Sequence, residues 1–489
     1  FNMEYIYEAD EDILGLIYIS CKNIGNRKAT GSYYTSTKVV KNLISRLSFQ
    51  EPVKVLDPCC GTGNFLLQLP DVLPFDSIYG NDIDAASVKI TRLNMALKYN
   101  VPVAAIYEHI TGQDYLTDYA EKDFQYIIGN PPWGYDFSEE EKSHLRTIYK
   151  SATGKNIESY DVFIEQALNH LTDNGHLAYV LPEAILNVKA HTNIRKTILE
   201  NCSIKNLVFL GNAFDGVQCP CIILDLQCTR SPLSTVGMNV NTGTDSFTIN
   251  IERTVSVEYF SFTTSDAEYN IMCKIRSMPN SAYLLDNADF ALGIVTGNNK
   301  EYISDIKNEN NEMILKGADI CKYHITRTNN YIVFKPENFQ QAAPTEMYRS
   351  PEKLLYRFIS SQLVFAYDDK QTLSLNSCNI VIPRLPGTKI KYVLAILNSR
   401  IAQFIYKKEF NSVKVLRSHI ENIPIPTADA STQAEIIALT DKLISGLQAD
   451  EAEKVYDELD LLVSKAFHLD SNEIEIINKA VEGDNKFLA

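Results

Sequence analysis

The feature that most constrains the fold is the alternation of short apolar segments with helix-like segments between residues 30 and 228. Near-continuous apolar runs are typical of strands buried on both faces of a parallel sheet. Apolar residues spaced three and four apart indicate helices between them. The pattern therefore predicts an α/β domain with helices on both faces of the sheet. The predicted strands are residues 53–57, 77–82, 124–130, 176–182, 205–211 and 220–226, and the predicted helices are residues 38–48, 84–98, 160–171 and 190–200.

The pattern changes after residue 228. Residues 229–250 are rich in Ser, Thr, Gly and Asn, a composition that indicates a linker. Beyond it, β-like segments alternate with irregular connections, and apolar spacing predicts one helix at residues 390–407. We therefore expect an α/β domain at 1–228 that starts with a helix at 4–22, a linker at 229–250, a mixed α+β domain at 251–426, and acidic C-terminal helices at 427–489.

A ligand site is predicted where the first strand ends, in 55-VLDPCCGTGNFLL-67. The strand ends at Asp57 and runs into Gly61 and Gly63, which open a helix. Small glycines let a ligand approach the backbone at the carboxyl edge of a sheet, beside a helix N-terminus. A dinucleotide site would have a third glycine where Leu66 stands, and the chain contains no nucleotide-triphosphate loop.

Two further acidic residues follow the next strands. Asp82 stands 25 residues beyond Asp57, where an acidic residue can bind both hydroxyls of a ribose. Asp114 is followed by Tyr115, a pair that suits adenine, since the acid accepts from the amino group while the ring covers the base. Three acids at successive strand ends predict a nucleoside site on one edge of the sheet.

The stretch 126-YIIGNPPWGYDF-137 places the only tryptophan beside two prolines. The prolines fix φ twice and remove two N–H donors, so their carbonyls are free to accept. The amide oxygen of Asn130 and a proline carbonyl can accept from one NH₂ group, which prepares its nitrogen to attack a methyl sulfonium. Trp133 can stack on a planar amide or base. Such a site works mainly by orientation and electrostatics.

These motifs, in the order 31-GSYYTS-36, DPCCGTGNF, GNDID, QDYL and GNPPWG, resemble the adenine-N6 DNA methyltransferases of restriction–modification systems. The resemblance is to the group that runs cofactor first, catalysis second and target recognition last, and it covers about residues 30–228. It implies a Rossmann-like, S-adenosylmethionine-dependent methyltransferase domain followed by a C-terminal DNA-recognition domain. The implied reaction is methyl transfer to the exocyclic N6 of adenine in a specific duplex sequence, after the base is flipped out.

The resemblance also assigns roles to residues. The target adenine is taken by Asn130, Pro131 and Trp133, where Trp replaces the commoner Tyr of the motif. Phe214, in 210-LGNAFDGVQCPCIILDL-226, would form the second face of the stack around the base, although it also fits a core position. The residues that would surround S-adenosylmethionine are Thr35, Asp57, Pro58, Gly61, Gly63, Asp82, Ile83, Asp114 and Tyr115.

The net charge of −15 argues at first sight against a nucleic-acid partner. Residues 351–417, however, hold 11 basic and 4 acidic residues, a net of +7, interleaved with aromatic residues. We expect phosphate contacts from this segment. The DNA-binding residues predicted from it are Lys353, Arg357, Arg384, Lys389, Lys391, Arg400, Lys407 and Lys408.

Other functions fit the same motifs. The acceptor amine could belong to adenine in RNA or to a glutamine side chain in a protein. The chain could also be the modification part of a fused restriction–modification enzyme, or a non-catalytic DNA-recognition subunit. The size of the region 229–489 favours sequence-specific DNA.

Several features limit where such a protein works. The ten cysteines show no CxxC pair and no zinc spacing, so we expect free thiols and no metal. No apolar run approaches the ~18–20 residues of a membrane span, and the acidic start does not resemble a signal peptide. We expect a cytoplasmic monomer without membrane contact, whose partners are double-stranded DNA and a cognate restriction endonuclease.

Overall fold

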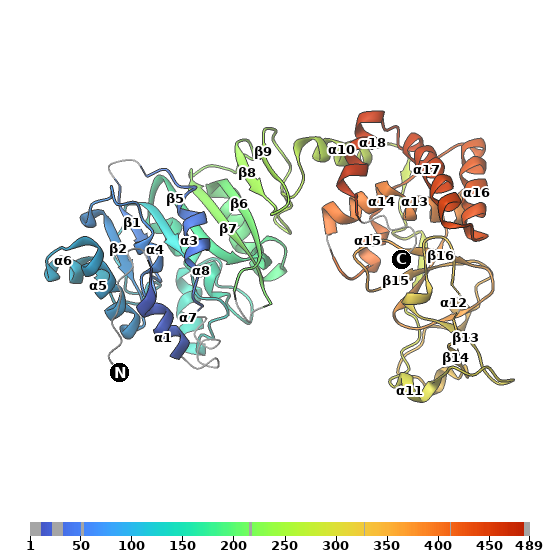
Figure 1. Cartoon of the computed structure of the whole chain (residues 1–489), viewed down its shortest axis with the longest axis horizontal. Coiled ribbons are helices and arrows are strands. Elements are labelled where there is room, and N and C mark those ends of the chain that lie inside the picture. The colour runs from blue at the N-terminus through green and yellow to red at the C-terminus, as the bar shows by residue number, and fades with distance from the viewer. Residues whose placement is uncertain are drawn as a thin grey trace. The chain divides into compact units, whose positions relative to one another are not determined.

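The computed structural model describes residues 11–21, 33–49, 53–214, 218–326, 328–410 and 412–483. The chain divides into two compact units, Phe1–Ser265 and Asp266–Ala489 (Figure 1). Within the described ranges, no helix is long and apolar enough to cross a membrane. All ten cysteines are free thiols, as expected, and five of them are buried.

A nine-stranded sheet forms the centre of the first unit, in the order β3-β2-β1-β4-β5-β7-β6-β8-β9. The neighbours from β3 to β5 are parallel, which confirms an α/β domain. The sheet is mixed rather than wholly parallel, because β7 runs antiparallel to both β5 and β6. The connection from β6 to β7 is too short for the crossover that parallel strands need. The strands are β1 (Val55–Asp57), β2 (Ile78–Asn81), β3 (Ile110–Thr111), β4 (Phe124–Gly129), β5 (Leu171–Pro182), β6 (Cys202–Asn212), β7 (Pro220–Cys228), β8 (Met238–Asn241) and β9 (Ser246–Ile249).

All four helices predicted between the strands are present. Asp84 begins the helix that follows β2, since its side chain accepts from the backbone N–H of Ala86 at 3.3 Å. Of the N-terminal helix predicted at 4–22, residues 4–10 and 22 lie outside the described residues. The helices are α1 (Ile13–Cys21), α3 (Thr37–Ile44), α4 (Asn64–Leu67), α5 (Ala85–Tyr99), α6 (Val103–His109), α7 (Glu139–Ile148), α8 (Ser159–His170), α9 (Thr192–Asn201) and the short turns η1 (Phe75–Ser77), η2 (Glu183–Leu186) and η3 (Lys189–His191).

The linker predicted at 229–250 is wrong. This stretch contains β8 and β9, which extend the sheet, with β8 parallel to β6 and antiparallel to β9. Met238, Val240 and Ile249 are at most 1% exposed, so the hairpin contributes to the core. Most of the Gly, Ser and Thr residues that suggested a linker lie in the turns around the hairpin, whereas Ser246 and Thr248 belong to β9. The first unit therefore ends at Ser265 rather than at residue 228.

The second unit combines two four-stranded sheets with helices, as the predicted mixed α+β domain requires. One sheet runs β11-β18-β15-β16, with every neighbouring pair antiparallel. The other runs β12-β14-β13-β17. The elements up to residue 383 are α10 (Asp266–Arg276), β10 (Ser281–Ala282), β11 (Ala288–Ala291), α11 (Asn299–Tyr302), β12 (Ile303–Ser304), β13 (Glu312–Leu315), η4 (Gly317–Asp319), β14 (Tyr331–Ile332), η5 (Pro336–Asn338), α12 (Thr345–Tyr348), β15 (Lys353–Arg357), β16 (Phe365–Asp368), β17 (Leu373–Ser374) and β18 (Cys378–Pro383).

The single helix predicted at 390–407 is broken at Ser399. Its hydroxyl accepts from the backbone N–H of Ala402 at 3.1 Å and so caps a new helix. Apolar spacing did not reveal the break, because buried apolar residues continue on both sides of it. The remaining elements are α13 (Ile390–Asn398), α14 (Arg400–Ile405), the π-helical turn η6 (Tyr406–Phe410), α15 (Arg417–Glu421), β19 (Ile425–Pro426), α16 (Ala430–Ile444), α17 (Ala449–Ala466) and α18 (Ser471–Ala480).

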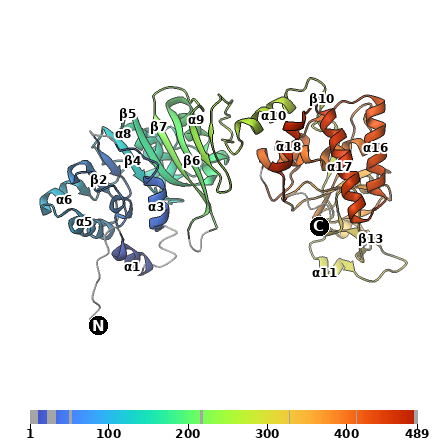
Figure 2. The same cartoon turned by 45° about the horizontal axis from the view of Figure 1, so that its top comes forward.

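The acidic C-terminal helices are confirmed as helices but not as a separate domain. Helices α16 and α17 lie side by side in both views (Figures 1 and 2). Leu443 and Val463 are buried in the same apolar core as Leu394 of α13. The predicted boundary at residue 427 therefore cuts through one packed core. Most acidic residues of these helices face outward, whereas Asp460 of α17 is buried.

Candidate active site

A cavity of about 440 Å³ lies at the carboxyl ends of β1, β2 and β4. This edge is where open α/β sheets bind ligands. Five predicted residues do not line the cavity directly, namely Asp57, Gly63, Pro131, Trp133 and Phe214. Those that do line it are Thr35, Pro58, Gly61, Asp82, Ile83, Asp114, Tyr115 and Asn130.

The turn after β1 brings backbone N–H groups to the cavity. Gly61 has a φ of 53° and donates its N–H to Asp82 at 2.8 Å. Asp57 is fully buried, accepts from the N–H of Cys59 at 3.2 Å, and burial raises its pKa well above the ordinary value. A Cβ on Gly129 would lie 2.6 Å from Asp57, and its φ is 144°, so both the space and the backbone require glycine there. Asp57 therefore supports the turn from behind the cavity wall.

The residues after β2 form another wall. Asp82 also accepts from the N–H of Asp84 at 2.8 Å, which fixes its carboxylate. Ile83 lines the cavity and is 71% exposed, so its side chain is accessible to a ligand there. The buried Asn81 bonds both the N–H and the carbonyl of Gln113 at 3.0 Å and so joins two ligand-edge segments. Asn81 was not predicted as a site residue, because an Asn at the end of a strand resembles an ordinary turn residue in sequence.

The next segment contributes a carboxylate and a ring. Asp114 accepts from the N–H of Leu116 at 2.9 Å. Tyr115 is 2% exposed, and its ring lies 5.5 Å from that of Phe163. Its buried hydroxyl has no hydrogen-bond partner in the described part of the chain. A bound ligand can therefore meet both a carboxylate and a fixed aromatic ring here.

Asn130 is held by its amide nitrogen. That nitrogen donates to the hydroxyl oxygen of Thr35 at 3.0 Å. The backbone carbonyl of Thr35 in turn accepts from Asn64 at 2.8 Å. The buried amide oxygen of Asn130 has no partner among the described residues. Asn130 thus presents a fixed and unused acceptor.

The two prolines are braced from one side. Ser159, at the start of α8 and fully buried, donates to the carbonyl of Pro132 at 2.5 Å and accepts from the N–H of Tyr135 at 3.4 Å. No described donor contacts the carbonyl of Pro131. The brace therefore fixes the turn while leaving one proline carbonyl able to accept. The sequence alone did not reveal Ser159, because it stands 27 residues beyond the carbonyl that it binds.

Three aromatic side chains meet beside this turn. The rings of Trp133 and Phe214 lie 4.8 Å apart at 86°, an edge-on contact. Tyr33 lies 5.5 Å from Trp133 and 6.1 Å from Phe214. The structure thus brings the two predicted stacking residues together, but edge to face rather than as parallel walls. Tyr33, whose role the sequence analysis did not predict, completes the cluster and lines the cavity.

Helix α1 closes another side of the cavity through Ile19. The helix is fastened by Asp12, whose buried carboxylate accepts from Thr62 and, at 2.9 Å, from Asn94 and the N–H of Gly15. Burial raises the pKa of Asp12. Since Thr62 belongs to the glycine-rich turn, this contact joins α1 directly to the ligand site.

The predicted DNA-binding residues include one clear error. Lys353 is fully buried, where it forms an ion pair with Asp368 and donates to the carbonyl of Tyr348 at 2.7 Å. It belongs to the core of the second unit and cannot reach DNA. Lys353 and Asp368 are paired across the ends of the adjacent strands β15 and β16, a contact that composition could not distinguish from a surface charge.

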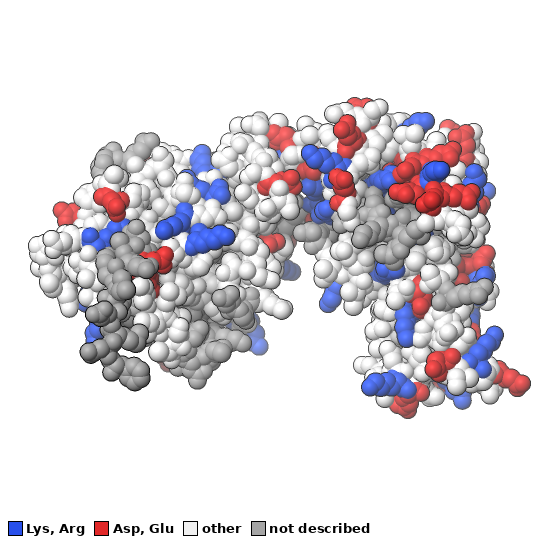
Figure 3. Space-filling view, viewed as in Figure 1, with Lys and Arg blue, Asp and Glu red and all other residues white. Residues whose placement is uncertain are grey.

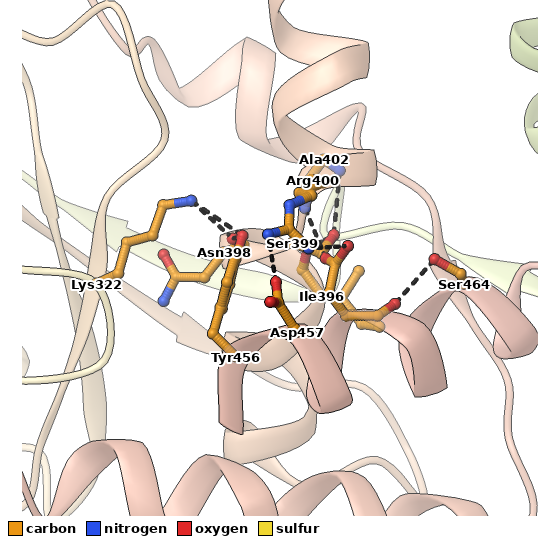
Figure 4. Close-up of polar contacts among 10 residues, drawn as sticks. Lys322, Ile396, Asn398, Ser399, Arg400, Ala402, Tyr456, Asp457 and Ser464 are labelled. Carbon is orange, nitrogen blue, oxygen red and sulfur yellow. Dashed lines mark hydrogen bonds and ion pairs between the residues drawn. The ribbon is translucent and has the colours of Figure 1, made fainter. Parts of the chain in front are cut away.

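Other predicted basic residues also have internal partners. Arg400 is ion-paired with Asp457 (Figure 4). It also pairs with Asp460, which accepts from the backbone N–H of Arg400 at 2.8 Å. Lys408 pairs with Glu268 at 2.8 Å, and both side chains are less than 15% exposed. These pairs stabilise the second unit and leave little of Arg400 and Lys408 exposed to a phosphate, whose binding by these residues stays a prediction.

The remaining predicted residues are nearer the surface. Arg384 pairs with Asp289 at 2.8 Å, Lys391 with Asp441 at 2.6 Å, and Lys389 is exposed. Arg357 donates to the carbonyl of Ile320 at 2.7 Å, and Lys407 to that of Ala480 at 3.0 Å. Figure 3 shows acidic side chains gathered in the region of α16 and α17. The positive segment is therefore largely neutralised within its own unit.

Comparisons with known proteins match both parts of the chain. The family model described as N-6 DNA Methylase matches residues 9–244. The TaqI-like C-terminal specificity domain matches residues 312–425. Each match falls within one of the two structural units.

Individual relatives are consistent with these families. Type II methyltransferase M.VspI of Vibrio sp. (strain 343) is 29% identical over 321 residues, covering 64% of this chain and 76% of that protein. Type II methyltransferase M.CvrRI of Paramecium bursaria Chlorella virus XZ-6E is 31% identical over 166 residues, covering 34% of this chain and only 40% of that protein.

A solved structure covers nearly the whole chain. The Type IIL restriction-modification enzyme MmeI, determined in complex with DNA, matches 97% of this chain and 81% of its own with a TM-score of 0.57 and 13% identity. At this identity the likeness concerns the fold alone, and it confirms the predicted methyltransferase fold with a further C-terminal domain. On the two family matches, the chain belongs to the N-6 DNA methylases of restriction–modification systems, with a TaqI-like specificity domain in its second unit.

Proposed function

We propose that this protein transfers a methyl group from S-adenosylmethionine to the exocyclic N6 of adenine in a specific sequence of duplex DNA, with the target base flipped out of the helix. The observation that carries the proposal is the state of Asn130. Its amide nitrogen is held by Thr35, while its buried oxygen has no described partner. A buried acceptor without a donor is costly, and a substrate amine would satisfy it.

The cavity fits the proposed cofactor. A volume of about 440 Å³ is in the usual range for a small-molecule site. The carboxylates of Asp82 and Asp114 suit a ribose and an adenine amino group, and the exposed Ile83 suits the face of the base. When bound, S-adenosylmethionine supplies a methyl group on a sulfonium centre.

The chain's own residues would orient the acceptor. The oxygen of Asn130 and the carbonyl of Pro131 provide two acceptors for the two hydrogens of one NH₂ group. Accepting both hydrogens concentrates the lone pair on nitrogen, and the braced turn keeps these acceptors in place before the reaction. Trp133 and Phe214 would stack on the extruded base, an interaction worth ~1–3 kcal/mol per base.

The same acceptors would suit adenine in RNA or a glutamine amide in a protein. The specificity-domain match at 312–425 favours DNA. The proposed partner is a restriction endonuclease that cuts the same sequence, because methylation of that sequence would protect the host DNA from cleavage. The test is to supply the protein with methyl-labelled S-adenosylmethionine and equal amounts of duplex DNA, RNA and protein. We expect label on DNA as N6-methyladenine, and label confined to RNA or protein would reject the proposal.

A further inference from the structure

Two loops of the second unit lie side by side and expose branched apolar side chains. Ile359 is 68% exposed and Val413 is 67% exposed. An antiparallel bridge pairs Ile359 with Lys414. On either side of it, Ser360 donates its N–H to Val413 at 2.9 Å, and Val415 donates to Phe358 at 2.8 Å. We refer to residues 358–361 and 412–416 as the exposed ribbon.

The ribbon is anchored rather than loose. The side chain of Gln403, 1% exposed in α14, accepts from the N–H of Leu363 at 2.8 Å and donates to the carbonyl of Ser361 at 3.4 Å. The hydroxyl of Tyr406 donates to the carbonyl of Ser412 at 2.7 Å. Both loops are therefore held by the same helical segment, and their apolar side chains are displayed from a fixed backbone.

The register decides which side chains share a face. Since Ile359 is directly opposite Lys414, these two side chains lie on one face, and Ser360 and Val413 lie on the other. Each face thus combines an apolar side chain with a polar one. A two-stranded ribbon with usable side chains on both faces is one of the two elements that the major groove of B-DNA admits.

The charge around the ribbon favours a polyanion. Residues 353–367 and 410–420 contain no Asp or Glu. Lys414 is exposed and forms no ion pair among the described residues, while the nearby Arg417 is paired with Glu421 at 2.7 Å. The ribbon also lies inside the stretch that matches the specificity domain. An apolar patch alone would suit a protein partner equally well, but two stretches of chain without acids, one of which carries the exposed Lys414, suit DNA.

We propose that the exposed ribbon enters the major groove of the target duplex, where Ile359 and Val413 contact the edges of bases, thymine methyl groups above all, and Lys414 binds a flanking phosphate. Apolar contact reads the thymine methyl, and phosphate contacts fix the register of the protein on the duplex. The inference rests on the proposed function and identifies which residues of this chain take part in choosing the sequence.

The test begins with the wild-type protein in a host without adenine methylation, where sequencing of modified bases reveals the methylated motif. Ile359→Ala and Val413→Ala should each relax the motif at one position, with discrimination there falling about tenfold, the usual effect of one base pair. Lys414→Ala should leave the motif unchanged but weaken binding to every duplex. It should also reduce the slope of log affinity against log salt by about 0.9.

The matched control is Lys442→Ala, which removes an exposed lysine from the acidic helix α16 and should change neither motif nor salt slope. Thermal melting and binding of S-adenosylmethionine verify that each variant is folded. If the wild type methylates a motif and all three ribbon variants keep its motif, affinity and salt slope, the ribbon inference is wrong while the proposed function stands. A wild type that methylates no DNA overturns both.

Discussion

The hydrogen bond between Thr35 and Asn130 decides which end of the amide is available to a substrate. Without an acceptor at Thr35, the amide could rotate and present its NH₂ group instead. The NH₂ group of Asn130 would then face the NH₂ group of the substrate. The two could not form a hydrogen bond, and a buried donor would be left unsatisfied. We therefore propose that Thr35 positions Asn130 in addition to lining the cavity.

Replacing Thr35 by Val keeps the shape of the side chain and removes the acceptor. We expect kcat for methyl transfer to fall about 10- to 100-fold, since an unsatisfied buried group costs about 1–3 kcal/mol. Thr35→Ser keeps the hydroxyl and should retain most of the wild-type kcat. If Thr35 acted through packing alone, Thr35→Val would instead keep a higher kcat than Thr35→Ser. Single-turnover rates with saturating cofactor provide the measurement, and an unchanged rate in Thr35→Val would show that Asn130 is oriented by other contacts.

The edge-on contact of Trp133 and Phe214 has a consequence for base entry. A base cannot stack between rings that touch at 86°, so at least one ring must turn when the base arrives. Trp133 is the only tryptophan, so tryptophan fluorescence, excited at a wavelength that tyrosine does not absorb, reports on this position alone. We expect its emission to change when duplex DNA containing the target sequence binds, and not with a duplex in which the target adenine is replaced by an abasic site. Identical responses to the two duplexes would contradict entry of the base beside Trp133.

Asp82 and Asn130 could be predicted from sequence, because each stands at the end of a strand that the apolar pattern located, and both line the cavity. Asp114 also lines the cavity, but it was predicted from its place beside Tyr115, since β3 was not among the predicted strands. Residues such as Ser159 and Asp12 could not be predicted, since they act on segments far from them in the chain. Their signal is a three-dimensional contact, and a buried Ser or Asp has no periodicity of its own.

At the scale of elements, α1 shows how a short helix can complete a site. A Cβ on Gly15 would lie 1.9 Å from the carboxylate of Asp12 and 2.1 Å from the hydroxyl of Thr62. Helix α1 therefore approaches the glycine-rich turn as closely as glycine permits. Any larger side chain must displace the helix or the turn.

Gly15→Ala should loosen α1 and weaken binding of S-adenosylmethionine. Overpacking of this kind costs about 1–3 kcal/mol of stability. Here it would displace α1, which carries the cavity-lining residue Ile19. Titration calorimetry measures the affinity, and Leu16→Ala, at a 43% exposed position of the same helix, is the control that should leave it unchanged. Equal affinities for wild type and Gly15→Ala would show that α1 is not part of the cofactor site.

Elements with a strong apolar pattern were predictable, and elements defined by pairing were not. The apolar runs of β1 to β7 and the spacing of α5 and α8 located these elements to within a few residues, apart from β3 and the first residues of β5. The short β8–β9 hairpin is rich in turn residues, and only its pairing with β6 shows that it belongs to the sheet. For the same reason the direction of β7 could not be deduced from its apolar residues.

At the scale of the whole molecule, the proposed function assigns the chemistry to the first unit and the choice of sequence to the second. The methylase match and the cavity lie in the first unit, and the specificity-domain match and the exposed ribbon lie in the second. Net charge did not reveal this division well, because the basic residues of 351–417 include Lys353 and Arg400, which are bound to acids inside the unit. Exposure decides which charges a partner can reach, and composition does not report exposure.

The central claim is that Asn130 directs a methyl group to the N6 of adenine in DNA. The most direct test is to express wild type, Asn130→Ala or Asp82→Ala in a host without adenine methylation. The genomic DNA of each culture is then sequenced for modified bases. We expect N6-methyladenine at one short motif with wild type and none with Asn130→Ala, while purified Asn130→Ala still binds S-adenosylmethionine and Asp82→Ala binds it weakly. Absence of N6-methyladenine with wild type, or equal methylation with Asn130→Ala, would contradict this account.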